Sequence, residues 1–201
     1  MLSPGEQPRT QSINPRRIAL AILACLVVTA LLLSQKGNIV EYRLYFTEDR
    51  KSAAFEFGEL SENWTEKTLH EKFSGYPISC QPYQGSLAVE RACGVDVKSH
   101  NGVPALFISF FFTAGHLDQV SVNVPWWSLG TAYSSLVAAL GQPSASQLLP
   151  RDGVRLYGWR LPSGAALFLN RDRPLNPLSW NAIYWRSQSA CAQSSCFKNY
   201  E

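Results

Sequence analysis

A run of sixteen residues without a charged side chain, residues 18–33, constrains this chain more than any other feature of its sequence. At about 1.5 Å per helical residue the run spans roughly 24 Å, a little less than the hydrocarbon core of a bilayer. Arg16 and Arg17 precede the run and Lys36 follows it, an asymmetry that predicts a cytoplasmic N-terminus. The sequence therefore predicts a cytoplasmic arm over residues 1–17 and a transmembrane signal anchor over residues 18–34.

The apolar run is also compatible with a cleaved signal peptide. A cleavage site needs small residues at the end of the run, and here the run ends in Leu31, Leu32 and Leu33, which favours an uncleaved anchor. In both interpretations the rest of the chain is exported. We expect a single-pass protein of a bacterial inner membrane that contacts the lipid bilayer through residues 18–34 and has its C-terminal domain in the periplasm.

Four of the five cysteines follow the apolar run: Cys80, Cys93, Cys191 and Cys196. An even number of cysteines in an oxidising compartment predicts two disulfides. Three pairings are possible, and proximity in the sequence favours Cys80 with Cys93 and Cys191 with Cys196. Because the histidines are scattered and the sequence contains no Cys-x-x-Cys motif, we expect no metal and no cofactor.

The 201 residues are enough for one folded domain. Hydrophobic residues make up 46% of the chain and charged residues 16%, a composition that argues against disorder. The net charge of +3 comes from residues 1–36, which hold four Lys or Arg residues and one Glu, whereas residues 37–201 hold fourteen residues of each sign. A nucleic-acid-binding protein concentrates positive charge on its folded part. The sequence therefore predicts a neutral folded domain that does not bind nucleic acid.

Hydrophobic periodicity indicates the secondary structure after the anchor. Residues 39–46 alternate like a strand and predict a membrane-proximal β-hairpin over residues 37–60. Residues 61–74 and 128–140 are typical of helices that end at a glycine, and strand-like runs follow each of them. The predicted segments are a first helix-plus-sheet unit over residues 61–125, a second unit over residues 126–190, and a disulfide-containing tail over residues 191–201.

The two predicted units have the pattern of a repeat. The triplet Gly75-Tyr76-Pro77 ends the first helix, and Gly141-Gln142-Pro143 ends the second helix 66 residues later. Each triplet precedes an apolar hairpin and a further strand, an order that indicates duplication. The predicted fold class is α+β, a duplicated unit of a helix followed by antiparallel β-strands, behind one N-terminal transmembrane helix.

The second unit also resembles a known family. Its helix ends in LGQP at residues 140–143, its next strand contains LYGW at residues 156–159, and a glycine turn leads into an apolar strand over residues 164–169. This order resembles the SmpA/OmlA small lipoproteins of outer-membrane assembly, and the tandem form resembles the β-lactamase-inhibitor-protein fold. The resemblance implies helices packed on an antiparallel sheet, and a role in binding other proteins or stabilising assemblies without catalysis.

The sequence contains none of the common catalytic motifs, such as a Gly-x-Ser-x-Gly elbow, a P-loop or His-Glu-x-x-His. His70 lies among charged residues of a predicted helix, His100 at a predicted hairpin tip, and His116 in a predicted turn. The position of His70 is typical of a solvated residue. We therefore expect no enzymatic activity.

A period-two count along the strands predicts an aromatic binding face on the sheet. Leu106, Ile108, Phe110 and Phe112 would pack under the helices, which leaves the intervening residues on the other side. The residues predicted to share the open face are Phe107, Phe111, Arg155, Tyr157 and Trp159. Aromatic residues and arginine are enriched at protein-binding hot spots. In the alternative interpretation, a register error of one residue exchanges the faces or a loop covers them.

Charge distinguishes the two units. Residues 37–125 carry seven positive and eleven negative side chains, whereas residues 126–201 carry seven positive and three negative ones. The arginines of the second unit are candidates for a basic surface that binds an acidic partner or anionic head groups: Arg151, Arg155, Arg160, Arg171 and Arg173. Scattered, solvated arginines are the alternative interpretation.

These observations favour a membrane-anchored periplasmic protein-binding module, an accessory or scaffolding subunit of a cell-envelope complex whose partner is another envelope protein. One alternative is a periplasmic inhibitor or immunity protein that acts against an enzyme. Another is a small envelope hydrolase. An inhibitor would form a tight soluble complex without the anchor, a scaffold would depend on membrane neighbours, and a hydrolase would need polar residues that converge in a pocket.

Overall fold

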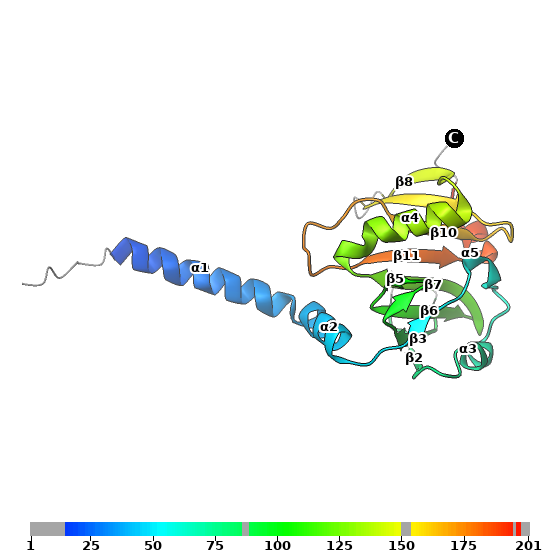
Figure 1. Ribbon diagram of the computed structural model, residues 1–201, viewed down its shortest axis with the longest axis horizontal. Coiled ribbons are helices and arrows are strands. Elements are labelled where there is room, and N and C mark those ends of the chain that lie inside the picture. Colours follow the sequence, from blue (N-terminus) through cyan, green and yellow to red (C-terminus); the bar gives the residue numbers. More distant parts are fainter. Residues whose placement is uncertain (1–14, 86–88, 150–153, 195, 198–201) are drawn as a thin grey trace, which may run out of the picture. The chain divides into compact units, whose positions relative to one another are not determined.

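Figure 1 shows the computed structural model of the chain, which describes residues 15–85, 89–149, 154–194 and 196–197. The chain divides into two compact units, Met1–Ile39 and Val40–Glu201. Most of the predicted cytoplasmic arm, residues 1–14, lies outside the described residues. In the predicted tail, residues 195 and 198–201 also lie outside them.

Helix α1 (Pro15–Ser34) contains the uncharged run. Several of its apolar side chains are exposed: Ile18, Leu20, Ile22, Leu23, Leu26 and Leu33. Among the described residues, no helix has both the length and the apolar character needed to cross a membrane. The helical conformation of the run is therefore observed, and the predicted transmembrane helix is not found.

The predicted β-hairpin over residues 37–60 is wrong. Helix α2 (Lys36–Thr47) takes the place of its first strand. The short strand β1 (Ser52–Ala53) then pairs in parallel with β4 (Ser99–His100), so it does not fold back onto the preceding segment. In a three-stranded sheet, β4 also pairs with β5 (Val103–Pro104).

Burial explains why the segment of α2 is helical despite its alternating sequence. Tyr42 and Tyr45 are three residues apart, a spacing that places them on one side of a helix. Both are buried and form a cluster with Leu106. The Tyr45 hydroxyl also donates a hydrogen bond to the backbone carbonyl of Lys98, 3.1 Å away. Contacts with residues far along the chain thus decide the local conformation.

The main sheet has eight strands, and each pairs antiparallel with its neighbours. In spatial order the strands are β2 (Ser79–Pro82), β3 (Arg91–Asp96), β6 (Phe107–Thr113), β7 (His116–Val124), β11 (Asn181–Arg186), β10 (Ala166–Asn170), β9 (Val154–Arg160) and β8 (Ala145–Leu149). The halves meet where β7 pairs with β11, so the two predicted units share one sheet. The α+β class is confirmed.

One helix precedes each half of the sheet. Helix α3 (Glu66–Lys72) is shorter than the predicted helix over residues 61–74, because Thr65 caps it by accepting a hydrogen bond from the Thr68 amide. Helix α4 (Leu129–Leu140) agrees with the predicted helix over residues 128–140. Figure 1 shows α4 crossing in front of the sheet.

Shorter helical elements complete the compact unit Val40–Glu201. Two 3-10 helices, η1 (Phe57–Glu59) and η2 (Trp126–Ser128), lie before α3 and α4 in the sequence. Helix α5 (Gln188–Ser194) follows the last strand and falls across the predicted start of the tail.

The main core lies between the sheet and helices α3 and α4. Alternate residues of the strands point into it, as expected for a sheet with one buried face: Ile108, Phe110, Phe112, Val120, Val122, Val124, Leu167, Leu169, Ile183 and Trp185. Leu69 of α3 and Leu136 of α4 belong to the same cluster. Of the core-facing residues predicted for β6, Ile108, Phe110 and Phe112 are therefore buried as expected, whereas Leu106 packs in the separate cluster with α2.

Both disulfides that proximity favoured are present. Cys80 of β2 and Cys93 of β3 lie directly opposite each other in the sheet, with their Cα atoms 4.0 Å apart. Cys191 of α5 and Cys196 close a short loop at the end of that helix. Cys25 in α1 is free and exposed.

Candidate binding groove beside helix α5

The structure separates the five residues predicted to form a binding face. Phe107 and Phe111 lie on the face of the sheet opposite α3 and α4, because the alternating residues of β6 belong to the main core. Both are half-buried under aromatic neighbours, with the Phe107 ring 5.4 Å from Trp180 and the Phe111 ring 5.5 Å from Tyr83.

The other three predicted residues belong to β9 and point the opposite way. Trp159 is 3% exposed, and its Nε1 donates a hydrogen bond to the Gly141 carbonyl, 2.9 Å away, at the end of α4. Tyr157 packs with its ring 4.7 Å from that of Tyr133 in α4. Arg155 lies on the same side and is exposed, with its Nε 4.0 Å from a carboxylate oxygen of Asp172.

The prediction for β9 was wrong by one residue of register, and the reason is side-chain volume. Gly158 of β9 lies on the face away from α4, where a Cβ atom would meet Phe168 at 3.2 Å and Phe197 at 3.0 Å. That face has no room for a tryptophan at this strand, whereas the helix face does. The predicted aromatic face is therefore not a single surface.

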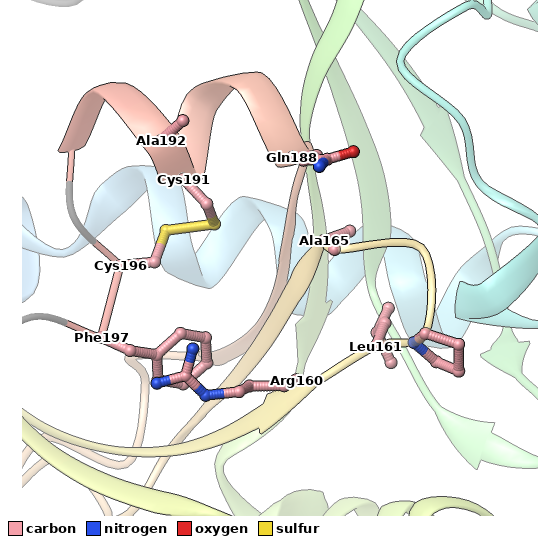
Figure 2. A pocket seen from close by; sticks show the side chains of 10 residues that line it. Arg160, Leu161, Ala165, Gln188, Cys191, Ala192, Cys196 and Phe197 are labelled. Atoms are coloured by element: carbon pink, nitrogen blue, oxygen red, sulfur yellow. A yellow bond between two sulfur atoms is a disulfide. The ribbon is translucent and has the colours of Figure 1, made fainter.

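A different site lies beside α5, where the structure contains a hollow of about 550 Å³. Its walls come from β9, the turn into β10, and α5 with the disulfide that follows: Arg160, Leu161, Pro162, Gly164, Ala165, Gln188, Cys191, Ala192, Cys196 and Phe197. Figure 2 shows Arg160 and Phe197 lying together on one side of this hollow, with the disulfide and Gln188 on the others. The volume is in the range of pockets that bind small ligands or peptide side chains.

Arg160 supplies the charge of the hollow. Its guanidinium carbon lies 4.2 Å from the centre of the Phe197 ring, a cation–π contact that holds the guanidinium beside the ring. Within the part of the chain that the structure describes, no carboxylate is paired with Arg160. An exposed guanidinium held in this way can bind a carboxylate with two parallel hydrogen bonds.

A second hollow, of about 320 Å³, adjoins the first, since Ala165 and Gln188 line both. Glu59, Glu62 and Asn63 contribute to its wall on the far side from Arg160. Glu62 also accepts a hydrogen bond from the Ser189 amide at 3.2 Å, which ties the segment before α3 to the start of α5. We call the two hollows together the α5 groove. One end of this groove is basic and the other end is acidic.

Sequence reasoning included Arg160 only as one of five arginines and missed the rest of the α5 groove. Of the others, Arg151 lies outside the described residues, Arg171 and Arg155 approach Asp172, and the guanidinium of Arg173 lies 5.1 Å from the Trp126 ring. The groove is assembled from segments far apart in the sequence, so no local pattern indicates it.

His100 is the most strongly perturbed titratable group outside the groove. The sequence placed it at a hairpin tip, and it does end β4 beside the turn into β5, but its side chain is buried against Phe55 and Phe57. Its Nε2 lies 3.1 Å from the Phe55 carbonyl and donates to it in the neutral tautomer. Burial lowers the pKa of His100 to about 4 and outweighs the opposing effect of that hydrogen bond. His100 is therefore neutral at physiological pH.

Comparisons with known proteins assign no family to this chain. No family model matches it, and no curated protein matches it. A similar solved structure is the crystal structure of a DUF4309 family protein (YjgB) from Bacillus subtilis, at 14% identity and a TM-score of 0.42, with 75% of this chain and 97% of that chain covered. A likeness at this level carries no inference about this chain.

Proposed function

We propose that the compact unit Val40–Glu201 is an exported protein-binding module that holds an extended segment of an envelope protein in the α5 groove. The observation that carries the proposal is the charge arrangement along the groove, with Arg160 at one end and Glu59 and Glu62 at the other. A bound segment would place an acidic side chain on Arg160 and a basic one near the two glutamates. The apolar walls between them would accept small hydrophobic side chains.

The arrangement of the sheet supports the same class of function. Each half is a helix followed by four antiparallel strands, and the last strands of the two halves pair at the centre. We propose that this arrangement is the duplication indicated by the Gly-x-Pro triplets. The resemblance to the inhibitor-protein fold rests on the same repeat and implies binding without catalysis. Two disulfides outside α1 support an oxidising compartment such as the periplasm.

Photo-crosslinking from the groove tests the function. A photoreactive side chain placed at Ala192, which is exposed and lines the groove, should capture one defined envelope protein in intact cells. The same side chain at Ala138, an exposed position of α4 away from the groove, is the matched control. Arg160→Glu should remove the Ala192 adduct, because it reverses the only charge that lines this end of the groove within the described residues. Mass spectrometry identifies the adducts.

Equal labelling from Ala192 and Ala138, or an Ala192 adduct that survives Arg160→Glu, would contradict the proposed groove. The identity of the partner separates the candidate roles. A captured enzyme that the purified protein inhibits supports the inhibitor or immunity role, whereas a structural component of an envelope complex supports the scaffolding role.

We also propose that helix α1 attaches the chain to a membrane. The support is its exposed leucine and isoleucine side chains, which are unfavourable in water. The full chain should sediment with membranes and resist extraction with alkaline carbonate, and a variant that lacks residues 1–36 should not. Recovery of the full chain in the soluble fraction would contradict membrane attachment.

A further inference from the structure

Two potential metal ligands on α3 lie beside the Cys80–Cys93 disulfide at the edge of the sheet. Glu66 and His70 lie four residues apart on α3 and so project from the same side of that helix. Ligand atoms of Glu66, Cys80 and Cys93 all lie within 4.8 Å of one another. The Nε2 atom of His70 lies 3.8 Å from the Sγ atom of Cys80. One carboxylate oxygen and two sulfur atoms therefore lie within 4.8 Å of one another, and the imidazole of His70 adjoins them on the Cys80 side.

We propose that, when the Cys80–Cys93 disulfide is reduced, these four side chains bind a zinc ion. Zinc prefers four ligands in a tetrahedron, and Cys, His and carboxylate side chains are its usual ligands. Tetrahedral Zn–S bonds of about 2.3 Å place the two sulfur atoms about 3.8 Å apart. Rotation about the Cα–Cβ bonds of the two cysteines separates their sulfur atoms once the covalent bond between them is broken.

The charges around the cluster fit a divalent cation. Zinc binding requires both thiols to be thiolates, and the Glu66 carboxylate adds a third negative charge. Arg91 of β3 donates hydrogen bonds to both carboxylate oxygens of Glu66, from Nη2 at 3.1 Å and from Nε. With this guanidinium included, the charges of the ligands and of a zinc ion cancel. Arg91 would thus orient the carboxylate, as partners of metal ligands commonly do.

The reduction step balances with a dithiol as reductant. A dithiol transfers two electrons and two protons to the disulfide, which gives the thiols of Cys80 and Cys93 and leaves the reductant as its own disulfide. Zinc then displaces the two protons from the thiols. Cys80 is half-buried on the edge strand β2 and is the accessible sulfur, whereas Cys93 is 1% exposed.

The second disulfide gives an internal comparison. Among the residues that the structure describes, the pair Cys191–Cys196 belongs to no comparable cluster of metal ligands. A cysteine pair alone supplies two ligands, and a zinc site that is stable at low concentration needs more. The proposal therefore predicts that reduction creates a metal site at one of the two cysteine pairs.

Cobalt(II) and zinc titrations of the full chain test the proposal, with Cys25→Ser as the background to remove the free thiol. After reduction with a phosphine, the chain should bind one Co²⁺, with a thiolate-to-metal charge-transfer band and the visible bands of tetrahedral cobalt. Zinc should displace the cobalt. His70→Ala and Glu66→Gln should each weaken binding about tenfold or more, since the loss of a ligand costs at least as much as the loss of its supporting partner. The double variant Cys191→Ser/Cys196→Ser should bind like the parent.

Several results would overturn the proposal. These are an absence of tetrahedral cobalt bands in the reduced chain, equal binding by the His70→Ala and Glu66→Gln variants, and binding that requires Cys191 and Cys196. Circular dichroism follows folding in each sample. A reduced chain that unfolds and does not refold when zinc is added also contradicts a site built from α3, β2 and β3.

Discussion

The free energy of unfolding should fall as the pH drops from about 6.5 to about 4, because His100 must remain neutral in the folded chain. Its side chain is 3% exposed and packs against the rings of Phe55 and Phe57. In the unfolded chain it titrates near its ordinary pKa of 6.5, whereas burial lowers its pKa in the folded chain to about 4. Between these values the unfolded chain binds the additional proton and gains stability relative to the folded chain.

The expected loss is on the order of 3 kcal/mol, which is the free energy of about 2.5 pKa units. It is absent above pH 6.5 and complete below pH 4. Urea unfolding of the full chain between pH 4 and 8 measures it, with His100→Gln as the test variant and His116→Gln as the matched control. His116 is exposed, so its variant should keep the pH dependence of the parent, whereas His100→Gln should lose most of it. A His100→Gln curve parallel to that of the parent would contradict the prediction.

The second large effect concerns Arg50, the buried cation that holds α2 to the sheet. Its side chain is 3% exposed. Its Nη1 donates to Glu41 of α2 at 2.8 Å and to the Leu106 carbonyl at 2.9 Å, and its Nε donates to Glu48 at 3.0 Å. Burial by itself lowers the pKa of Arg50, but Glu41, Glu48 and Asp96 together outweigh burial and raise the pKa above its ordinary value. The guanidinium therefore stays charged.

Arg50→Met should lower the free energy of unfolding by about 2–4 kcal/mol. The methionine keeps much of the volume, but it leaves the buried Leu106 carbonyl without this donor and the Glu41 carboxylate without its cation. Arg50→Lys should recover part of the loss, because it keeps the positive charge. The recovery should be incomplete, because one ammonium group cannot reproduce the three hydrogen bonds of the guanidinium. Chemical denaturation of the full chain gives both values.

Arg43→Met is the control for charge and helix propensity. Arg43 lies on the same helix and is exposed, so its replacement should change stability by less than about 0.5 kcal/mol. Equal destabilisation by Arg43→Met and Arg50→Met would show that the general loss of positive charge lowers the stability, and not the loss of the hydrogen bonds of the buried Arg50 guanidinium.

Local sequence patterns predicted the elements whose burial repeats with a regular period. The alternation in residues 106–112 correctly placed Ile108, Phe110 and Phe112 in the core, and glycine correctly ended the helix over residues 128–140. Where a segment fits both the strand period and the helix period, periodicity predicted the wrong element. Residues 39–46 alternate like a strand, yet Tyr42 and Tyr45 also satisfy helical spacing, and packing against Leu106 selects the helix.

The candidate site likewise depends on contacts that local sequence patterns do not contain. Residue type predicted Trp159 as a partner-binding residue, but it is buried in the main core and donates a hydrogen bond to Gly141 at the end of α4. The α5 groove needs β9, the segment before α3, and α5 to lie together, and no sequence pattern contains that information. Gly158 explains the wrong face at β9, because only the packed structure shows that Phe168 and Phe197 occupy the space beside it.

The sequence by itself determined the α+β class, the apolar N-terminal helix, most strand positions and the two disulfide pairs. These properties depend on local periodicity and on short distances along the chain. The tertiary structure alone decided the single eight-stranded sheet, the burial of His100 and Arg50, the α5 groove, and the meeting of Glu66 and His70 with the Cys80–Cys93 pair. The physical reason is that each of these features depends on contacts between residues far apart in the sequence. The free energies of such contacts depend on how the side chains pack and on which charges they bring together.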